Sequence, residues 1–148
     1  MKLRNGLLSL QKSLVRIITG SRYSISHTDP LFAKLAILKI DDLYTQRLRM
    51  FTYKLSRNLL PSGVSSLFGK ALHNYKTRGA TSNFYIGRSD SRSIKSIAPK
   101  CWNPLPSILK NSPSVGSFRD QSKRSLLAPY SAFSCDVAGC RSCCLMPA

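Results

Sequence analysis

The sequence predicts a mostly α-helical protein, in which a small irregular helical bundle is followed by a loop-rich, Pro- and Ser-rich segment and a disordered tail. Apolar residues recur at spacings of three and four through residues 3–19 and again after Asp41, as amphipathic helices require. From about residue 62 this periodicity is lost, and Ser, Gly, Pro, Asn and Arg dominate. We therefore expect a helical region over residues 1–60, a loop-rich segment with a short C-terminal helix over 61–130, and a Cys-containing tail over 131–148.

The first expected helix covers residues 3–19 and ends before Gly20, which can adopt the positive φ of a helix C-cap. Its apolar stripe consists of Leu3, Leu7, Leu10, Leu14 and Ile17, widened by Leu8, Val15 and Ile18. A second, short helix opens at Asp29-Pro30, because Asp can cap a helix and Pro is tolerated in its first turn. The apolar face of this helix consists of Leu31, Phe32, Leu35 and Leu38.

The third expected helix begins at Asp41 or Asp42 and stops before Pro61. Its buried stripe consists of Tyr44, Leu48, Phe51, Leu55 and Leu59, while Arg47, Lys54 and Arg57 lie elsewhere around the helix. Three amphipathic helices with short links favour a small bundle. In the second half of the chain we expect a short strand at residues 83–86 and a short helix from Ser117, as its cap, to Leu127.

The charge of the chain is strongly positive. Lys and Arg number 23 against six acidic residues, all of them Asp, which gives a net charge of +17 and a pI of about 10.3. A domain this basic most often binds nucleic acid, and an anionic membrane surface is the main competing partner. The composition of a degenerate reading frame is a further explanation. No apolar stretch is long enough to span a bilayer.

Location is predicted from the N-terminal region and the cysteines. No continuous apolar stretch of the kind found in a secretory signal is present, and an odd count of five cysteines argues for a reducing compartment. We expect an intracellular protein, nuclear or cytoplasmic. The first acidic residue is Asp29, so the preceding segment also fits a basic mitochondrial presequence, which is the minor alternative.

No enzyme active site and no cofactor are expected. Polymerases hold two metal ions with carboxylates placed at a tight turn between strands, whereas Asp41-Asp42 opens a helical segment, where Asp serves as a cap and dipole partner. Neither His27 nor His73 has a nucleophile partner in the sequence. We therefore predict no catalytic residues.

Nucleic-acid contact is predicted at scattered cations and at one mixed loop. Residues 73–78 combine an imidazole, an amide, a phenol and two cations, which suits phosphate contact and base stacking, although a polar loop with one half-buried Tyr explains them equally well. Trp102 is expected to be a packing anchor rather than a base-stacking residue. The candidate contact residues are Lys12, Arg16, Arg22, His73, Asn74, Tyr75, Arg78 and Lys100.

A metal site in the tail is the weaker of two interpretations. The four tail cysteines are Cys135, Cys140, Cys143 and Cys144. Structural zinc sites normally use two short C-x₂₋₄-C knuckles, which this irregular spacing lacks. A plant-type iron–sulfur spacing is formally present without the surrounding fold. We therefore predict an unligated, disordered tail.

Several segments, taken in order, resemble the region downstream of the polymerase domain in jockey-like and related non-LTR (LINE-type) retrotransposon polyproteins. They are Leu10–Lys12, Arg16–Gly20, His27–Phe32, Leu35, Ile37–Ile40, Asp42–Tyr44, His73–Arg78 and Pro99–Pro106, continued by Ile108, Lys110, Ser112 and Phe118. The resemblance implies a non-catalytic C-terminal fragment of a reverse transcriptase that contacts template RNA or target DNA, with the absent polymerase domain as a further partner. A genomic relic without selected activity, or a basic mitochondrial or ribosome-associated protein, are the alternatives.

Overall fold

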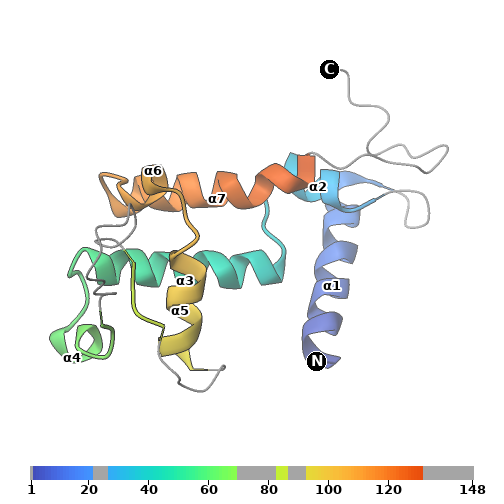
Figure 1. The fold of residues 1–148 in the computed structure, drawn as a ribbon. Helices are drawn as coiled ribbons and strands as arrows, with labels where there is room; N and C mark the ends of the chain where they lie inside the picture. Colours follow the sequence, from blue (N-terminus) through green and yellow to red (C-terminus); the bar gives the residue numbers. More distant parts are fainter. Residues whose placement is uncertain (1, 22–26, 70–82, 87–92, 132–148) are drawn as a thin grey trace. The chain divides into compact units, whose positions relative to one another are not determined.

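The computed structural model describes residues 2–21, 27–69, 83–86 and 93–131 and is mostly helical, as predicted (Figure 1). Within these residues it contains no sheet, and Phe84 forms only an isolated bridge. The helices are α1 (Lys2–Thr19), α2 (Asp29–Lys34), α3 (Ile40–Ser56), α4 (Ser62–Ser65), α5 (Ile94–Trp102), α6 (Ser107–Lys110) and α7 (Val115–Ser131).

The chain forms two compact units. Unit 1 comprises Met1–Tyr44 and Lys123–Ala148, and unit 2 comprises Thr45–Ser122, so the boundaries fall within α3 and α7. The expected division into residues 1–60, 61–130 and 131–148 stays a prediction about domains. The predicted disordered tail lies outside the described residues, apart from Ser131.

The core of unit 1 joins three segments that are distant in sequence. Val15 of α1, Leu31 and Phe32 of α2 and Tyr130 of α7 are buried together, and the rings of Phe32 and Tyr130 meet edge to face with centroids 6.3 Å apart. Helix α1 begins and ends much as predicted, whereas α2 begins at Asp29 as predicted but ends at Lys34, before Leu38 of its expected apolar face. Gly20 has φ +65°, and the N–H of Ser21 donates to the carbonyl of Arg16 at 3.0 Å, which closes α1 as a glycine C-cap does.

The predicted apolar stripe of α1 forms, but it does not pack into the core of unit 1. Leu3, Leu7, Leu10, Leu14 and Ile17 are all exposed. The side of α1 turned inward carries Val15 and Gln11, whose amide donates to the carbonyl of Leu38 and accepts from the N–H of Ile40. Because these contacts fix the rotation of the helix, the leucine stripe faces away from the core.

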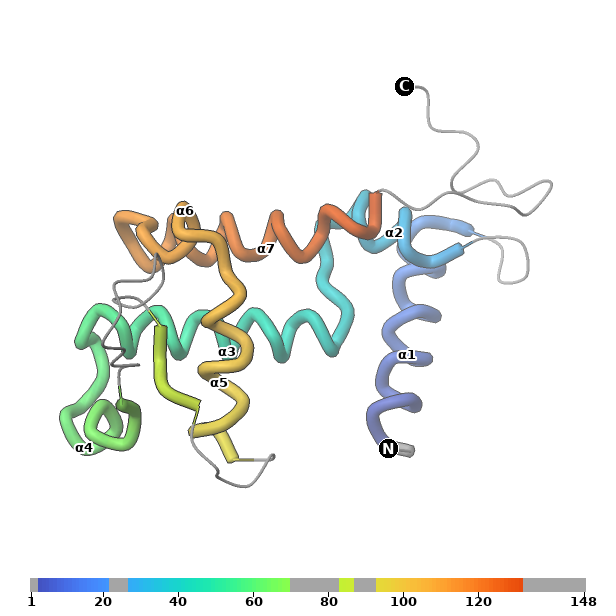
Figure 2. Tube along the Cα trace, in the orientation of Figure 1, coloured from blue at the N-terminus to red at the C-terminus, as the bar shows by residue number. Residues whose placement is uncertain are grey.

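Unit 2 is built around a cluster of aromatic side chains. The core residues are Tyr53, Leu55, Phe84, Trp102, Leu105 and Phe118. In unit 2, α3 and the first turns of α7 run side by side in opposite directions, and the rings of Tyr53 and Phe118 stack with centroids 4.4 Å apart (Figure 1). Trp102, the last residue of α5, also packs against Phe118, with their ring centroids 5.9 Å apart. Figure 2 traces the chain from α5 through α6 to α7.

Helix α3 ends earlier than predicted, and part of its expected buried stripe is exposed. Asn58 adopts φ +55°, and the N–H of Leu59 donates to the carbonyl of Lys54, so a left-handed Asn rather than Pro61 ends the helix. Leu48 and Leu55 are buried as expected. Tyr44 and Leu59 are exposed, Phe51 is half-buried, and Tyr53 takes the central place in the core instead.

The second half of the chain contains more helix than predicted. Residues 94–102, which lie in the predicted loop-rich segment, form α5. This helix contains Pro99 and is capped by Ser93, whose side-chain oxygen accepts from the N–H of Lys95. The last helix begins two residues before Ser117 and is 17 residues long. Its cap is Ser114, whose hydroxyl accepts from the N–H of Ser117 at 3.1 Å. The predicted strand at residues 83–86 was wrong, because Phe84 bonds to a side chain rather than to a strand ladder.

Candidate nucleic-acid interface

Most of the predicted contact residues lie outside the described part of the chain. These are Arg22, His73, Asn74, Tyr75 and Arg78, and the four tail cysteines, Cys135, Cys140, Cys143 and Cys144, are outside it as well. The expectations for the loop and for the tail therefore stay predictions. Lys12, Arg16 and Lys100 are described.

Lys12 and Arg16 are half-buried on α1 in unit 1, on the side of the helix opposite its exposed leucines. Lys100 is exposed on α5 in unit 2. The three cations therefore belong to two different units. Half-burial of Lys12 and Arg16 limits their access to phosphate, whereas Lys100 is exposed.

Besides Lys100, the described part of unit 2 carries five exposed cations that were not among the predicted contact residues. Its exposed Lys and Arg residues are Arg47, Lys54, Arg57, Lys95, Lys100 and Arg119. Asp120 is the acidic residue of the described part of unit 2, and it pairs with Arg119 at 3.2 Å. The guanidinium of Arg57 donates to the carbonyl of Ser112 at 3.0 Å and lies 5.6 Å from the centroid of the Tyr53 ring.

The other four of these residues, Arg47, Lys54, Lys95 and Lys100, form what we call the cationic set. Within the described residues, no carboxylate lies at ion-pair distance from any of the four. Their exposure follows from the packing of their helices. Arg47 and Lys54 are seven residues apart, about 10 Å along one face of α3, while Leu48 and Leu55 on a neighbouring face are buried. This seven-residue spacing beside two leucines was the signal in the sequence that could have identified Arg47 and Lys54 as exposed.

Trp102 is a packing residue, as predicted. It is only 1% exposed, and its ring packs against Tyr53, Phe84 and Phe118. Trp102, two residues after Lys100, is therefore not available to stack on a base. Any stacking partner for a base bound at Lys100 has to come from another residue.

Asn103, which follows Trp102, holds the segment that contains Phe84. Its amide nitrogen donates to the carbonyl of Phe84 at 2.9 Å, and its amide oxygen accepts from the N–H of Phe84 at 3.0 Å. One side chain thus satisfies both backbone groups of Phe84, as a neighbouring strand would. Trp102 and Leu105 are thus core residues, and Asn103 holds Phe84 in place beside them.

Lys110 is a buried cation whose role is structural. Its ammonium group donates to the amide oxygen of Asn83 and to the carbonyl of Asn103, both at 2.9 Å, and lies 5.9 Å from the centroid of the Trp102 ring. Burial lowers the pKa of Lys110. Because its donors point into unit 2, Lys110 is not a phosphate contact.

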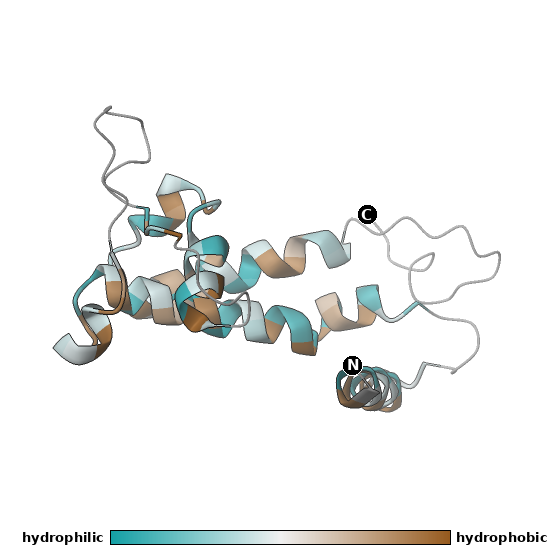
Figure 3. Cartoon of the chain, turned by 60° about the horizontal axis from the view of Figure 1, so that its bottom comes forward, coloured by the Kyte–Doolittle hydropathy of each residue, from teal (hydrophilic) through white to brown (hydrophobic). Residues whose placement is uncertain are grey.

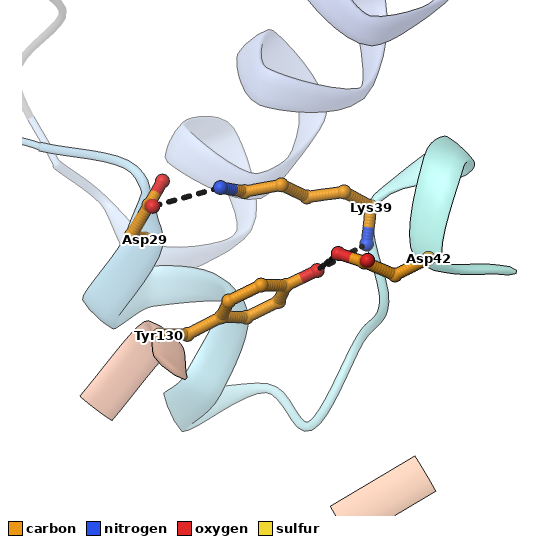
Figure 4. A network of polar contacts seen from close by, with 4 residues as sticks. All are labelled: Asp29, Lys39, Asp42 and Tyr130. Atoms are coloured by element: carbon orange, nitrogen blue, oxygen red, sulfur yellow. Dashed lines mark hydrogen bonds and ion pairs between the residues drawn. The ribbon is translucent and has the colours of Figure 1, made fainter. Parts of the chain in front are cut away.

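The two adjacent aspartates of α3 lie in the first turn of that helix, as predicted, and their side chains bond to other segments of unit 1. Asp41 pairs with Arg4 of α1, and that hydrogen bond lowers the pKa of Asp41. Asp42 accepts a hydrogen bond from the hydroxyl of Tyr130 (Figure 4). In the described ranges, no three His, Cys, Asp or Glu side chains lie close enough together to hold a metal ion.

Tyr130 is the centre of this polar network (Figure 4). Its hydroxyl also accepts from the backbone N–H of Lys39 at 3.2 Å, and the ammonium group of Lys39 lies 4.6 Å from the ring centroid while pairing with Asp29 at 2.7 Å. Burial, followed by the hydrogen bond to Asp42, raises the pKa of Tyr130. The network ties α7 to the N-terminal end of α3 and to α2, so it stabilises unit 1.

Comparison of the chain with models of protein families, with curated proteins and with solved structures gives no significant match. Among the helices that the structure describes, none is both long and apolar enough to cross a lipid bilayer.

Proposed function

We propose that this chain is a non-catalytic nucleic-acid-binding segment, the part of a non-LTR retrotransposon reverse transcriptase that follows the polymerase domain. The observation that carries the binding function is the imbalance of charge on unit 2. Six of its cations are exposed, while its one described carboxylate already pairs with one of them. A surface of this kind attracts phosphate by displacing counterions. The family origin rests on the order of the sequence segments that resemble those polyproteins.

The cationic set makes the phosphate contacts in this proposal, together with the predicted loop at residues 73–78. Contacts of this kind position a protein on RNA or DNA without reading its sequence. The partners are template RNA or target DNA, beside the polymerase domain of the same polyprotein. A nuclear or cytoplasmic location follows from these partners.

The test is a titration of the full chain with labelled RNA and duplex DNA at several salt concentrations, followed by fluorescence anisotropy. Each phosphate contact contributes roughly 0.7–0.9 to the slope of log K against log salt. Replacing both Lys54 and Lys100 with Ala should therefore lower the magnitude of the slope by roughly 1.4–1.8, the contribution of two phosphate contacts. The charge-conserving Lys54→Arg and Lys100→Arg pair should retain it.

Arg119→Ala combined with Arg57→Ala is the matched control, because it removes two exposed cations that are already engaged within unit 2. Its slope should stay closer to that of the unaltered chain. Equal loss in the two double variants, with heparin bound as tightly as RNA, would contradict the proposal. The chain would then be a basic polypeptide without a binding surface, as a genomic relic would be.

A further inference from the structure

Helix α1 exposes an unusual row of apolar side chains. Leu3, Leu7, Leu10, Leu14, Ile17 and Ile18 are between 50% and 93% exposed. Figure 3 shows α1 nearly end-on, with its hydrophobic residues gathered on one side and its hydrophilic residues on the other. A row of six large aliphatic side chains in water is costly, so it indicates a contact surface.

The spacing of this row is that of a coiled-coil seam. From Leu3 to Ile17 the intervals are four, three, four and three residues, which places Leu7 and Leu14 at a positions and Leu3, Leu10 and Ile17 at d positions of a heptad. A strict a/d stripe is narrower than the face that a helix normally buries in its own domain. The pattern is therefore suited to another helix.

The remaining side of α1 is already engaged within unit 1. Val15 is buried in the core, Gln11 bonds to the backbone of Leu38 and Ile40, and Arg4 pairs with Asp41. Turning the helix to bury the seam would break all of these contacts. The seam therefore needs a partner from outside the described residues of unit 1.

We propose that the partner is a second copy of this chain, and that the two α1 helices associate through their seams. The charges beside the seam favour this partner. The flanking e and g positions are Arg4, Gln11, Ile18, Gly6, Ser13 and Gly20. Only Arg4 among them is charged, and its charge is already paired with Asp41, so two seams can meet without opposing like charges.

The burial of the polar side of α1 argues against a lipid surface as the partner. A helix that lies on an anionic membrane carries Lys and Arg on its polar face, from which they reach the lipid headgroups. On α1 the cations of that face, Lys12 and Arg16, are half-buried, which limits their reach. An acidic partner helix would need available cations at the flanking positions, where only Arg4, already paired with Asp41, is charged.

The expected association is weak and reversible. Two seams bring together ten aliphatic side chains, twice the five of one copy, and would bury on the order of 1,000 Å², at the lower end of specific interfaces. Repulsion between two chains of net charge +17 opposes it at low salt. Salt screens that repulsion, so dimerisation should strengthen as salt rises, in contrast to nucleic-acid binding.

The test is sedimentation equilibrium of the full chain, cleared of nucleic acid by nuclease treatment, at about 0.5 M salt, where charges are screened within ~5 Å. The disrupting variant is Leu7→Lys with Leu14→Lys, which puts two charges into the seam at exposed positions. The matched control is Asn5→Lys with Ser9→Lys, which adds the same two charges to exposed positions of α1 away from the seam. A third variant, Leu7→Glu with Leu14→Glu, is mixed with the lysine variant.

The unaltered chain and the control should both form a dimer. The dissociation constant of that dimer should be at least tenfold higher in the lysine variant. Mixing the lysine and glutamate variants should restore association, which only a seam-to-seam contact between two copies explains. Circular dichroism checks that all variants keep their helix content. A monomer at every concentration, or a dimer unaffected by the lysine variant, would overturn the proposal. So would a monomer that binds anionic phosphatidylserine vesicles through the same leucines.

Discussion

The hydroxyl of Tyr130 donates a hydrogen bond to the carboxylate of Asp42, which lies 88 residues earlier in the chain. This bond joins the last turn of α7 to the first turn of α3 within unit 1 (Figure 4). It also gives Asp42 a structural role, beside an Asp41 that pairs with Arg4. The adjacent aspartates thus bond to two different helices.

Tyr130→Phe should destabilise the chain by about 1–2 kcal/mol, because it removes a hydrogen bond to a charged group. Burial and the bond to Asp42 raise the folded pKa of Tyr130 above its ordinary value of 10.0. Tyr130 therefore contributes its full stabilisation below about pH 10, and that contribution is lost as the pH rises toward the folded pKa. Urea denaturation can be measured from about pH 7 to about pH 12. The difference in the free energy of unfolding between the unaltered chain and Tyr130→Phe should shrink above about pH 10. A constant difference would contradict this assignment.

Asn103→Ala should destabilise the chain by about 1–3 kcal/mol, because both backbone groups of the buried Phe84 lose their partner. The matched control is Asn111→Ala, which removes an exposed amide from the same region and should change stability by less than about 0.5 kcal/mol. Thermal or urea denaturation of the three proteins measures the difference. Equal effects at the two positions would show that the bonds to Phe84 do not matter.

The purified chain should show no primer extension and no nuclease activity with Mg²⁺ or Mn²⁺. Asp41 and Asp42 are engaged by Arg4 and Tyr130, and a two-metal site needs carboxylates that converge on the ions. Asp42→Asn should instead lower the stability of unit 1, by about 1 kcal/mol. Activity that disappears in Asp41→Asn and Asp42→Asn would mean that the chain is an enzyme.

The predicted loop can be tested separately from the cationic set. His73→Ala and Tyr75→Ala should weaken binding to single-stranded RNA or DNA by about 1–3 kcal/mol, with the salt slope retained, if their rings stack on bases. Ser107→Ala, at an exposed position of α6, is a control that should bind as the unaltered chain does. If the loop variants match this control while the Lys54 and Lys100 variant loses affinity, the loop plays no part in recognition.

The sequence predicted those features of the fold that depend on neighbouring residues. Helices α1, α2 and α3 appear where apolar residues recur at helical spacing, and Gly20 ends α1 because a residue without a side chain easily takes positive φ. Phe32 and Trp102 are buried as large apolar groups should be. Residues 94–102 were predicted to be part of a loop-rich segment, because periodicity is lost there and a proline inside a helix is rare, yet α5 accommodates Pro99.

Sequence alone determined that this chain is helical, basic and equipped with a leucine stripe at positions 3–17, because each of these is a property of neighbouring residues. Only the tertiary structure decided which side of α1 is buried. Periodicity identifies an apolar face but not the contacts that compete with it, and here the bonds of Gln11 and the burial of Val15 outweigh the stripe within unit 1. The pairing of Asn103 with Phe84 and of Tyr130 with Asp42 likewise joins residues 19 and 88 positions apart. Contacts over such separations depend on how the chain folds back, which no local pattern records.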